Sequence, residues 1–126
     1  MDRPGYFFEP TILRNVTQDM RVMREETFGP IAPVMAFANE EEAIAVANNS
    51  DFGLNASVWT QDLRRGERIA GQLRAGGVFI NRPSASQPLI PLGGIKKSGY
   101  GRELGEIGIR EFTNSKPINV YTVGEP

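Results

Sequence analysis

The 126-residue sequence contains neither cysteine nor histidine. Without cysteine the chain can form no disulfide, bind no metal through a thiolate and offer no cysteine nucleophile. Without histidine it can form no imidazole metal site and no Ser-His-Asp arrangement. We therefore expect no metal site, and few of the side chains that commonly carry out covalent catalysis remain.

The sequence also lacks an excess of charge of one sign and a long apolar run. The 14 basic and 15 acidic residues are scattered and give a net charge of −1, which provides no electrostatic basis for binding nucleic acid or an anionic membrane. The N-terminal residues are polar, and no apolar run is long enough to span a bilayer. We expect a cytoplasmic protein with neither partner, whose length and 40% hydrophobic content suit one domain around one core.

Segments typical of strands and helices alternate along the chain. Asn39 and Asp62 are suited to cap two helices, and Glu42 can complete a capping box with Asn39. Apolar residues at helical spacing extend the second helix from Leu63 to Leu73. This alternation predicts an α/β fold, with a mostly parallel sheet and flanking helices. The predicted strands are 9–16, 31–37, 55–60, 78–80 and 117–123, and a third helix is predicted at 103–112.

The run from Arg24 to Pro30 has the composition of a turn that holds a ribose. A carboxylate offers two acceptor oxygens to the two neighbouring hydroxyl groups of a ribose, so one glutamate, Glu26, can bind both. Phe28 would add an apolar wall for a nicotinamide ring. The same residues also fit a solvated pair, Glu25 and Glu26, followed by a phenylalanine in the core. The run alone does not decide between these interpretations.

Other motifs favour the ribose interpretation, because together they resemble the aldehyde dehydrogenase family along essentially the whole chain, with succinate-semialdehyde dehydrogenases as the most similar group. The resemblance implies that Glu26 anchors the nicotinamide ribose of NAD or NADP, that Phe28 lies against the nicotinamide ring and that Leu54 lies nearby. The motifs occur in the family's order and are GYFFEPT (5–11), NNSDFGL (48–54), AGGVFIN (75–81), PLGGIKKSG (91–99), GRELG (101–105) and EFTNSK (111–116).

The resemblance also implies what this chain lacks. The family's reaction begins with attack of a thiolate on the aldehyde, passes a hydride to NAD(P)+ and ends when water, activated by a glutamate base, hydrolyses the thioester. Neither the nucleophile nor the base maps onto this sequence, so we assign no catalytic residue. We expect 1–112 to be a partial catalytic domain that acts on an aldehyde together with a missing N-terminal half. The isolated chain is expected to bind no cofactor and to have no dehydrogenase activity.

The C-terminal segment 113–126 is expected to form an oligomerisation strand and tail, because the family uses this strand to extend a partner's sheet. We therefore expect a homo-oligomer. An alternative hypothesis is that the chain is a noncatalytic module, derived from the family, whose role is assembly with other subunits.

The loop from Arg82 to Leu92 resembles the family's substrate-facing loop. Many relatives place a phenylalanine where this chain has Leu92, which gives a softer, non-aromatic wall. Relatives that oxidise succinate semialdehyde often carry an arginine near Leu89, and the apolar residue there argues against that substrate unless Arg82 supplies the charge. The candidate substrate-binding residues are Arg82, Ser84, Ser86 and Leu92.

Overall fold

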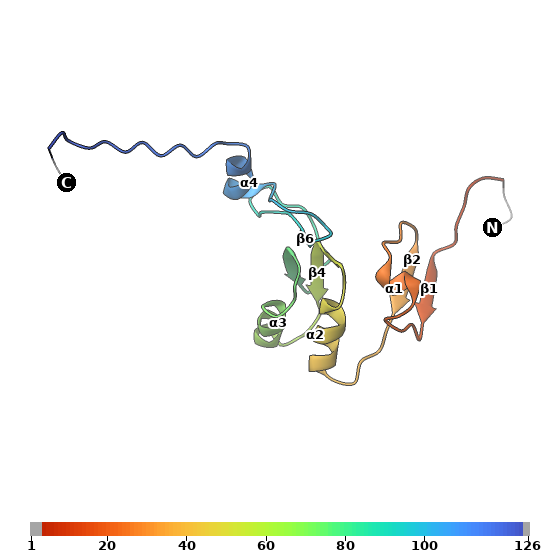
Figure 1. Ribbon diagram of the computed structural model, residues 1–126. Helices are drawn as coiled ribbons and strands as arrows, with labels where there is room; N and C mark the ends of the chain where they lie inside the picture. Colours follow the sequence, from red (N-terminus) through yellow and green to blue (C-terminus); the bar gives the residue numbers. More distant parts are fainter. Residues whose placement is uncertain (1–3, 125–126) are drawn as a thin grey trace.

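The computed structural model describes residues 4–124. Residues 1–3 and 125–126, which belong to the outer ends of the expected segments 1–112 and 113–126, lie outside the described residues. Short strands and helices alternate along the described chain (Figure 1). In order, they are β1 (Thr11–Arg14), α1 (Arg21–Arg24), β2 (Ile31–Val34), α2 (Glu40–Asn48), β3 (Phe52–Gly53), β4 (Asn55–Val58), α3 (Leu63–Ala70), β5 (Gly77–Ile80), β6 (Ile95–Lys96) and α4 (Gly105–Glu111).

The strands form three separate two-stranded sheets among the described residues. β1 pairs with β2 and β4 pairs with β5, both in parallel, whereas β3 and β6 pair in antiparallel fashion. The α/β class with mainly parallel strands is thus confirmed, and among the described residues these strands form separate pairs. The connection from β2 to β4 runs through α2 and β3, but the described structure contains no ladder between β2 and β4. The β1–β2 pair stands apart from the β4–β5 pair in Figure 1.

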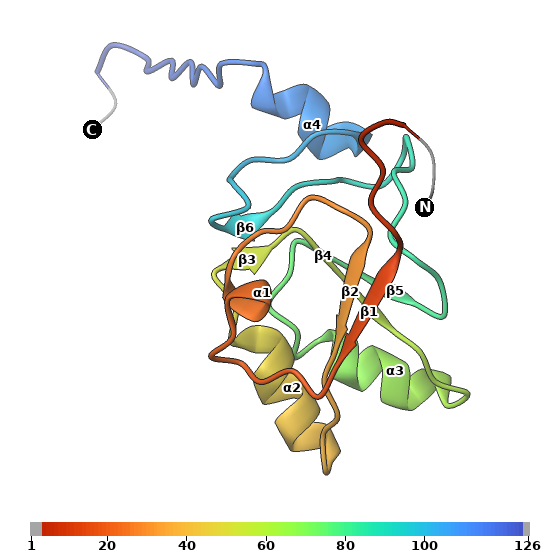
Figure 2. The ribbon, with the colours of Figure 1, turned by 90° about the vertical axis from the view of Figure 1, so that its right-hand side faces the viewer.

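The molecule therefore has two lobes. The N-terminal lobe contains β1, α1 and β2 (residues 11–34), and the central lobe runs from α2 to β6 (residues 40–96). Figure 2, turned by 90° from Figure 1, shows α2 and α3 at the same end of the molecule and α4 at the opposite end. Gln18 joins the lobes, because its side chain donates to the Val46 carbonyl at 3.1 Å and accepts from the Asn49 amide at 2.9 Å.

Both predicted helix caps are present. The Asn39 side chain accepts a hydrogen bond from the Glu42 backbone N–H at 2.9 Å, and the Asp62 carboxylate accepts one from Arg65 at 3.0 Å. The capping box differs from the expected form, since the Glu42 carboxylate accepts from the backbone N–H of Ala38, one residue before the cap. Helix α3 ends at Ala70 rather than at Leu73, because the chain turns there through a C-cap glycine.

Polar side chains hold α2 against α3 at one end of α2 and against the turn after α3 at the other end. In the first turn of α2, the Glu40 carboxylate binds Arg65 at 2.7 Å and also pairs with Arg68. At the last turn, the Asn48 side chain donates to the Gln72 carbonyl at 2.8 Å and accepts from the Arg74 N–H at 2.6 Å. These contacts join residues far apart in sequence, so they hold the two helices of the central lobe as a unit.

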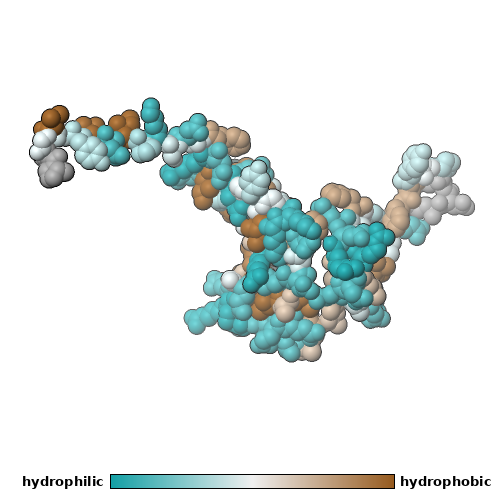
Figure 3. Space-filling view, viewed as in Figure 1, coloured by the Kyte–Doolittle hydropathy of each residue, from teal (hydrophilic) through white to brown (hydrophobic). Residues whose placement is uncertain are grey.

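The expected core is almost absent. Val16 is the one large hydrophobic residue that is buried within the described chain, at 6% exposure. The chain exposes 10669 Å², whereas a compact protein of this mass exposes about 6,700 Å². Figure 3 shows apolar atoms open to solvent and a gap between the lobes. The excess of about 4,000 Å² indicates that the apolar faces of this chain lack a partner within it.

The described part of the C-terminal segment, 113–124, contains no strand. The strand predicted at 117–123 is not formed within the described chain, because residues 113–124 form no ladder and extend away from the rest of the molecule (Figure 1). Pairing of this segment with another subunit stays a prediction. A strand needs a neighbour for its backbone hydrogen bonds, and the described chain offers none. The predicted helix at 103–112 starts later, at Gly105, because Glu103 instead pairs with Leu92. Among the described residues, no helix has the length and apolar character needed to cross a membrane.

Candidate functional site

Glu26 and Leu54 lie at one cavity although 28 positions separate them in the sequence. Glu26 follows α1 in the N-terminal lobe, and Leu54 connects β3 to β4 in the central lobe. Both line a cavity of about 360 Å³, which we call the clamp hollow. Its other walls include the end of α2 and the turn before β5. The structure thus brings together two of the three residues predicted to bind the cofactor.

The two adjacent glutamates differ in their surroundings. Glu25 forms a two-bond ion pair with Arg21, with both N–O distances at 2.8 Å. These hydrogen bonds to Arg21 lower the pKa of Glu25 from its ordinary value. Glu26, by contrast, makes no hydrogen bond or ion pair within the described part of the chain and is exposed at the hollow. Its two carboxylate oxygens are therefore available to a ligand, as a ribose clamp requires.

Backbone contacts hold the segment that carries Leu54. The Gly53 N–H donates to the Ser98 hydroxyl at 3.0 Å, and β3 pairs with β6. A Cβ at Gly53 would lie 2.8 Å from the Ile95 side chain and 2.9 Å from the Arg74 carbonyl, so only glycine fits.

Lys96 holds the same segment from its other end. Its ammonium donates to the carbonyls of Asn48 at 3.0 Å and Ser50 at 2.8 Å, at the C-terminal end of α2. Lys96 and Ser98 lie within the motif 91–99, but the sequence does not show these contacts, because their partners lie more than 40 positions away in the chain.

Phe28 does not line the clamp hollow. Its side chain is 91% exposed, in a turn where Gly29 also has open space around it. No residue of the described chain holds the ring against Glu26 or Leu54. Contact between Phe28 and a nicotinamide ring therefore stays a prediction.

Most of the predicted substrate loop also gathers at one place. Arg82, Ser86 and Leu92 line a cavity of about 370 Å³, which we call the loop hollow, whereas Ser84 is exposed and does not line it. Leu92 is fixed by backbone hydrogen bonds of 2.8 and 2.7 Å with Glu103. The loop is thus anchored at Leu92 and also at Pro88, whose carbonyl accepts from the Gly105 N–H at 2.9 Å, and most of its other residues are exposed.

A third cavity joins the two predicted sites. Leu54 and Leu92 both line this bridging hollow, of about 490 Å³. Leu54 also borders the clamp hollow, and Leu92 also borders the loop hollow. The predicted cofactor end and the predicted substrate end therefore share walls through two leucine side chains. A ligand that reached from Glu26 toward Arg82 would pass both of them.

Close backbone contacts shape the bridging hollow. A Cβ at Gly76 would lie 1.7 Å from the Gly93 carbonyl oxygen, so the two segments touch through their backbones. The Arg102 guanidinium donates to the carbonyls of Gly94 at 3.0 Å and Gly101 at 2.6 Å. The glycines and the arginine of these motifs thus pack the wall of the hollow. Within residues 4–124, no cluster of three or more acidic side chains could hold a metal ion.

Known proteins match this chain along most of its length. The model of the aldehyde dehydrogenase family matches residues 1–118. The chain is 52% identical over 114 residues to an aldehyde dehydrogenase of Paenarthrobacter nicotinovorans, a match that covers 90% of this chain and 25% of that protein. It is 47% identical over 120 residues to the succinate-semialdehyde dehydrogenase (NADP+) of Deinococcus radiodurans, covering 95% of this chain and 25% of that protein.

Solved structures agree with these matches. A double mutant of betaine aldehyde dehydrogenase from Staphylococcus aureus, in complex with NAD+, superimposes with a TM-score of 0.90 at 41% identity and covers 98% of this chain and 27% of its own. An aldehyde dehydrogenase of Mycobacterium tuberculosis complexed with NAD+ gives a TM-score of 0.86 at 42% identity. That match covers 96% of this chain and 26% of the Mycobacterium chain. The chain spans about a quarter of the length of these relatives. The resemblance read from the motifs is confirmed, and the chain belongs to the aldehyde dehydrogenase family.

Proposed function

We propose that this chain is the C-terminal part of an NAD(P)-dependent aldehyde dehydrogenase, which oxidises an aldehyde to a carboxylic acid. In this proposal the chain supplies the clamp for the nicotinamide ribose and part of the funnel for the aldehyde. The rest of the enzyme supplies the nucleophile and the base. NAD(P)+, when bound, accepts the hydride of this reaction.

The free carboxylate of Glu26 at the clamp hollow carries the proposal. Glu25 is already paired with Arg21, so Glu26 is the glutamate that can accept hydrogen bonds from two ribose hydroxyls. Leu54 gives the same hollow an apolar wall, as an aromatic ring requires. We further propose that Phe28 closes against the nicotinamide ring once the rest of the enzyme covers this turn.

On the substrate side, we propose that Leu92 and Ser86 form the wall of the aldehyde funnel. Arg82 lies at the same hollow and is suited to pair with a carboxylate at the far end of a semialdehyde. Leu89, where an arginine would serve that purpose in related enzymes, is 90% exposed and apolar. Ser84 is retained as a candidate that a rearranged loop would bring to the funnel.

A chimeric enzyme tests the proposal. This chain would replace the matching quarter of the aldehyde dehydrogenase of Paenarthrobacter nicotinovorans, and aldehyde-dependent NAD(P)H formation would be measured. We expect turnover, and we expect Glu26→Gln to raise the KM for the cofactor about 10- to 100-fold, because charge-assisted hydrogen bonds contribute about 1.5–3 kcal/mol. Glu25→Gln is the matched control and should leave that KM nearly unchanged. A folded chimera without turnover would refute the proposal.

A second candidate function is assembly. The tail at 113–124 has no partner strand within the described chain, and Val120, Tyr121 and Val123 are exposed. We propose that this segment pairs with a neighbouring subunit and makes the whole enzyme a homo-oligomer. If assembly were the only function, the chimera would form oligomers without turnover.

For the isolated chain we predict neither dehydrogenase activity nor saturable NAD+ binding at micromolar concentrations. Glu26 and Leu54 contact one end of a ligand whose other contacts lie elsewhere, and partial contact gives weak binding. A cytoplasmic location stays a prediction from the sequence.

A further inference from the structure

Asn55, the first residue of β4, carries an amide that has no partner within the chain. Its Oδ1 atom is the one buried side-chain polar atom that lacks a hydrogen-bond partner among the described residues. Its Nδ2 atom also makes no hydrogen bond there, but it is not buried. An unsatisfied buried acceptor costs about 1–3 kcal/mol, so this amide does not serve the stability of the central lobe.

Gly77 provides the room for this amide. Asn55 pairs with Gly77 in the parallel ladder of β4 and β5. A Cβ at Gly77 would lie 2.7 Å from the Asn55 Oδ1 atom, so a side chain at position 77 would displace the amide. Gly77 does not have a positive φ, so the glycine is needed for space rather than for its backbone conformation. The strand pair thus holds an amide without a partner at one defined place.

That place is the junction between the two predicted sites. Asn55 lines the clamp hollow together with Glu26 and Leu54. It also lines the loop hollow together with Arg82 and Ser86. Among the described residues, Asn55 is the one that lines both hollows. A polar group at this position can therefore contact a ligand that extends from the ribose clamp toward the aldehyde funnel.

The nicotinamide of the proposed cofactor has one polar group suited to this junction. The ring nitrogen carries the ribose, the carbon opposite that nitrogen accepts the hydride, and the carboxamide is attached to the carbon next to the accepting one. If Glu26 holds the ribose and the accepting carbon faces the aldehyde, the carboxamide lies at the aldehyde end of the ring. The carboxamide oxygen accepts hydrogen bonds, and the Nδ2 group of an asparagine donates them.

We propose that Asn55 is a further cofactor-binding residue, whose Nδ2 group donates a hydrogen bond to the carboxamide oxygen of the nicotinamide. This inference rests on the proposed function. Glu26 would hold the ribose, and Asn55 would hold the opposite end of the attached ring. The hydrogen bond would keep the ring from turning about its bond to the ribose, so that one face of the ring stays toward the aldehyde.

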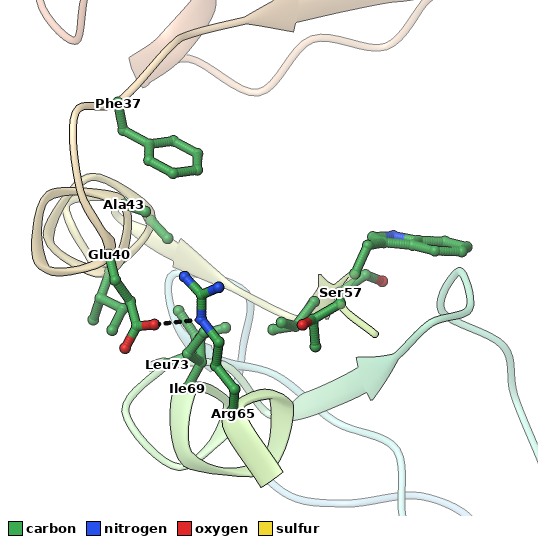
Figure 4. Close-up of a pocket in the computed structure, with 12 residues that line it drawn as sticks. Phe37, Glu40, Ala43, Ser57, Arg65, Ile69 and Leu73 are labelled. Atoms are coloured by element: carbon green, nitrogen blue, oxygen red, sulfur yellow. Dashed lines mark hydrogen bonds and ion pairs between the residues drawn. The ribbon is translucent and has the colours of Figure 1, made fainter. Parts of the chain in front are cut away.

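Two substitutions and a matched control test Asn55 in the chimeric enzyme. Asn55→Ala removes the amide, and Asn55→Asp keeps its shape but replaces the N–H donor with an acceptor. Ser57→Ala is the control, because Ser57 lies on the same strand but lines a different cavity, between α2, α3 and β4 (Figure 4).

The Kd for NAD+ is measured by calorimetric titration without aldehyde, so the result does not depend on turnover. We expect Asn55→Ala and Asn55→Asp to raise this Kd about 2- to 10-fold or more, the range for loss of one hydrogen bond, and Ser57→Ala to leave it unchanged. The urea midpoint of the Asn55→Ala chimera should stay the same or rise, because the substitution removes an unsatisfied buried acceptor.

Two analogues of NAD+ identify the contacted atom. The thionicotinamide analogue has sulfur, a weaker acceptor, in place of the carboxamide oxygen. The acetylpyridine analogue keeps the oxygen and has a methyl group in place of the NH₂ group. We expect the effect of Asn55→Ala on the Kd to fall below about twofold with the first analogue and to persist with the second, because the substitution and the sulfur remove the same hydrogen bond.

The other outcomes would overturn the inference. An active chimera whose Kd is unchanged by Asn55→Ala would exclude the contact and leave the proposed function intact, and a lowered urea midpoint with that unchanged Kd would give Asn55 a structural role instead. An effect that persists with the thionicotinamide analogue and disappears with the acetylpyridine analogue would show that Oδ1 accepts from the carboxamide NH₂ group, contrary to our assignment. A folded chimera that neither binds NAD+ nor turns over would refute the proposed function and this inference with it.

Discussion

The contact between Gly76 and Gly93 allows the wall of the bridging hollow to be tested by a single methyl group. A Cβ at Gly76 would lie 1.7 Å from the Gly93 carbonyl oxygen and 3.1 Å from the Leu54 carbonyl oxygen. An ordinary contact needs more than 3 Å, so Gly76→Ala must move one backbone segment by about 1.5 Å, and overpacking of this kind costs about 1–3 kcal/mol or more. Because Gly93 lines the hollow next to Leu92, the shift should also widen the aldehyde funnel.

Gly71→Ala is the matched control. Gly71 caps α3 with helical backbone angles, and a Cβ there would meet no atom closer than 3.7 Å. This substitution should be neutral or stabilise by about 0.4–1 kcal/mol, because alanine reduces the freedom of the unfolded chain. In the chimeric enzyme, Gly76→Ala should lower the urea midpoint and raise the KM for the aldehyde, whereas Gly71→Ala should do neither. Equal midpoints for the two variants would show that the 76–93 contact is absent and that our account of the wall is wrong.

Further predictions concern charge and assembly. Hydrogen bonds to Arg68 and Arg65 lower the pKa of Glu40 from 4.5 to about 2. The ionised carboxylate therefore stabilises the α2–α3 contact fully above pH 4.5 and progressively less as the pH falls toward 2. Acid titration of the chimera should show this loss of stability, and Glu40→Gln should abolish that part of the pH dependence. Removal of residues 113–126 from the chimera should shift its mass in light scattering toward the monomer, and an unchanged mass would argue against the C-terminal strand as the oligomer contact.

The features predicted correctly from the sequence depend on near neighbours. Asn39 and Asp62 cap their helices through backbone N–H groups three residues away, and turn chemistry of this kind is visible in a short window. The features missed depend on distant partners. Lys96 binds carbonyls more than 40 positions away, and α1 and β3 are four and two residues long, too short to show a period.

The differences from the expected elements share a physical cause. One sheet through all the strands, and the expected strand at 117–123, both require neighbours that the described chain does not contain. Patterns of apolar residues show which segments are suited to burial, but they do not show which other segment will cover them. For a chain that spans about a quarter of its relatives, strand identity was therefore easier to predict than sheet order. The same cause accounts for Phe28. Its aromatic side chain is suited to pack against a neighbour, but it is 91% exposed because the described chain provides no neighbour for it.

The position of the clamp depends on how the two lobes are held. Glu26 belongs to the N-terminal lobe and Leu54 to the central lobe, so the width of the clamp hollow changes with any movement of one lobe relative to the other. The side-chain bonds of Gln18 described above are exposed or half-exposed, and such bonds contribute about 0.5–1.5 kcal/mol each. That is too little to fix a cofactor site. The isolated chain therefore holds Glu26 and Leu54 at a fixed separation only weakly, which agrees with the weak cofactor binding that we predict for it.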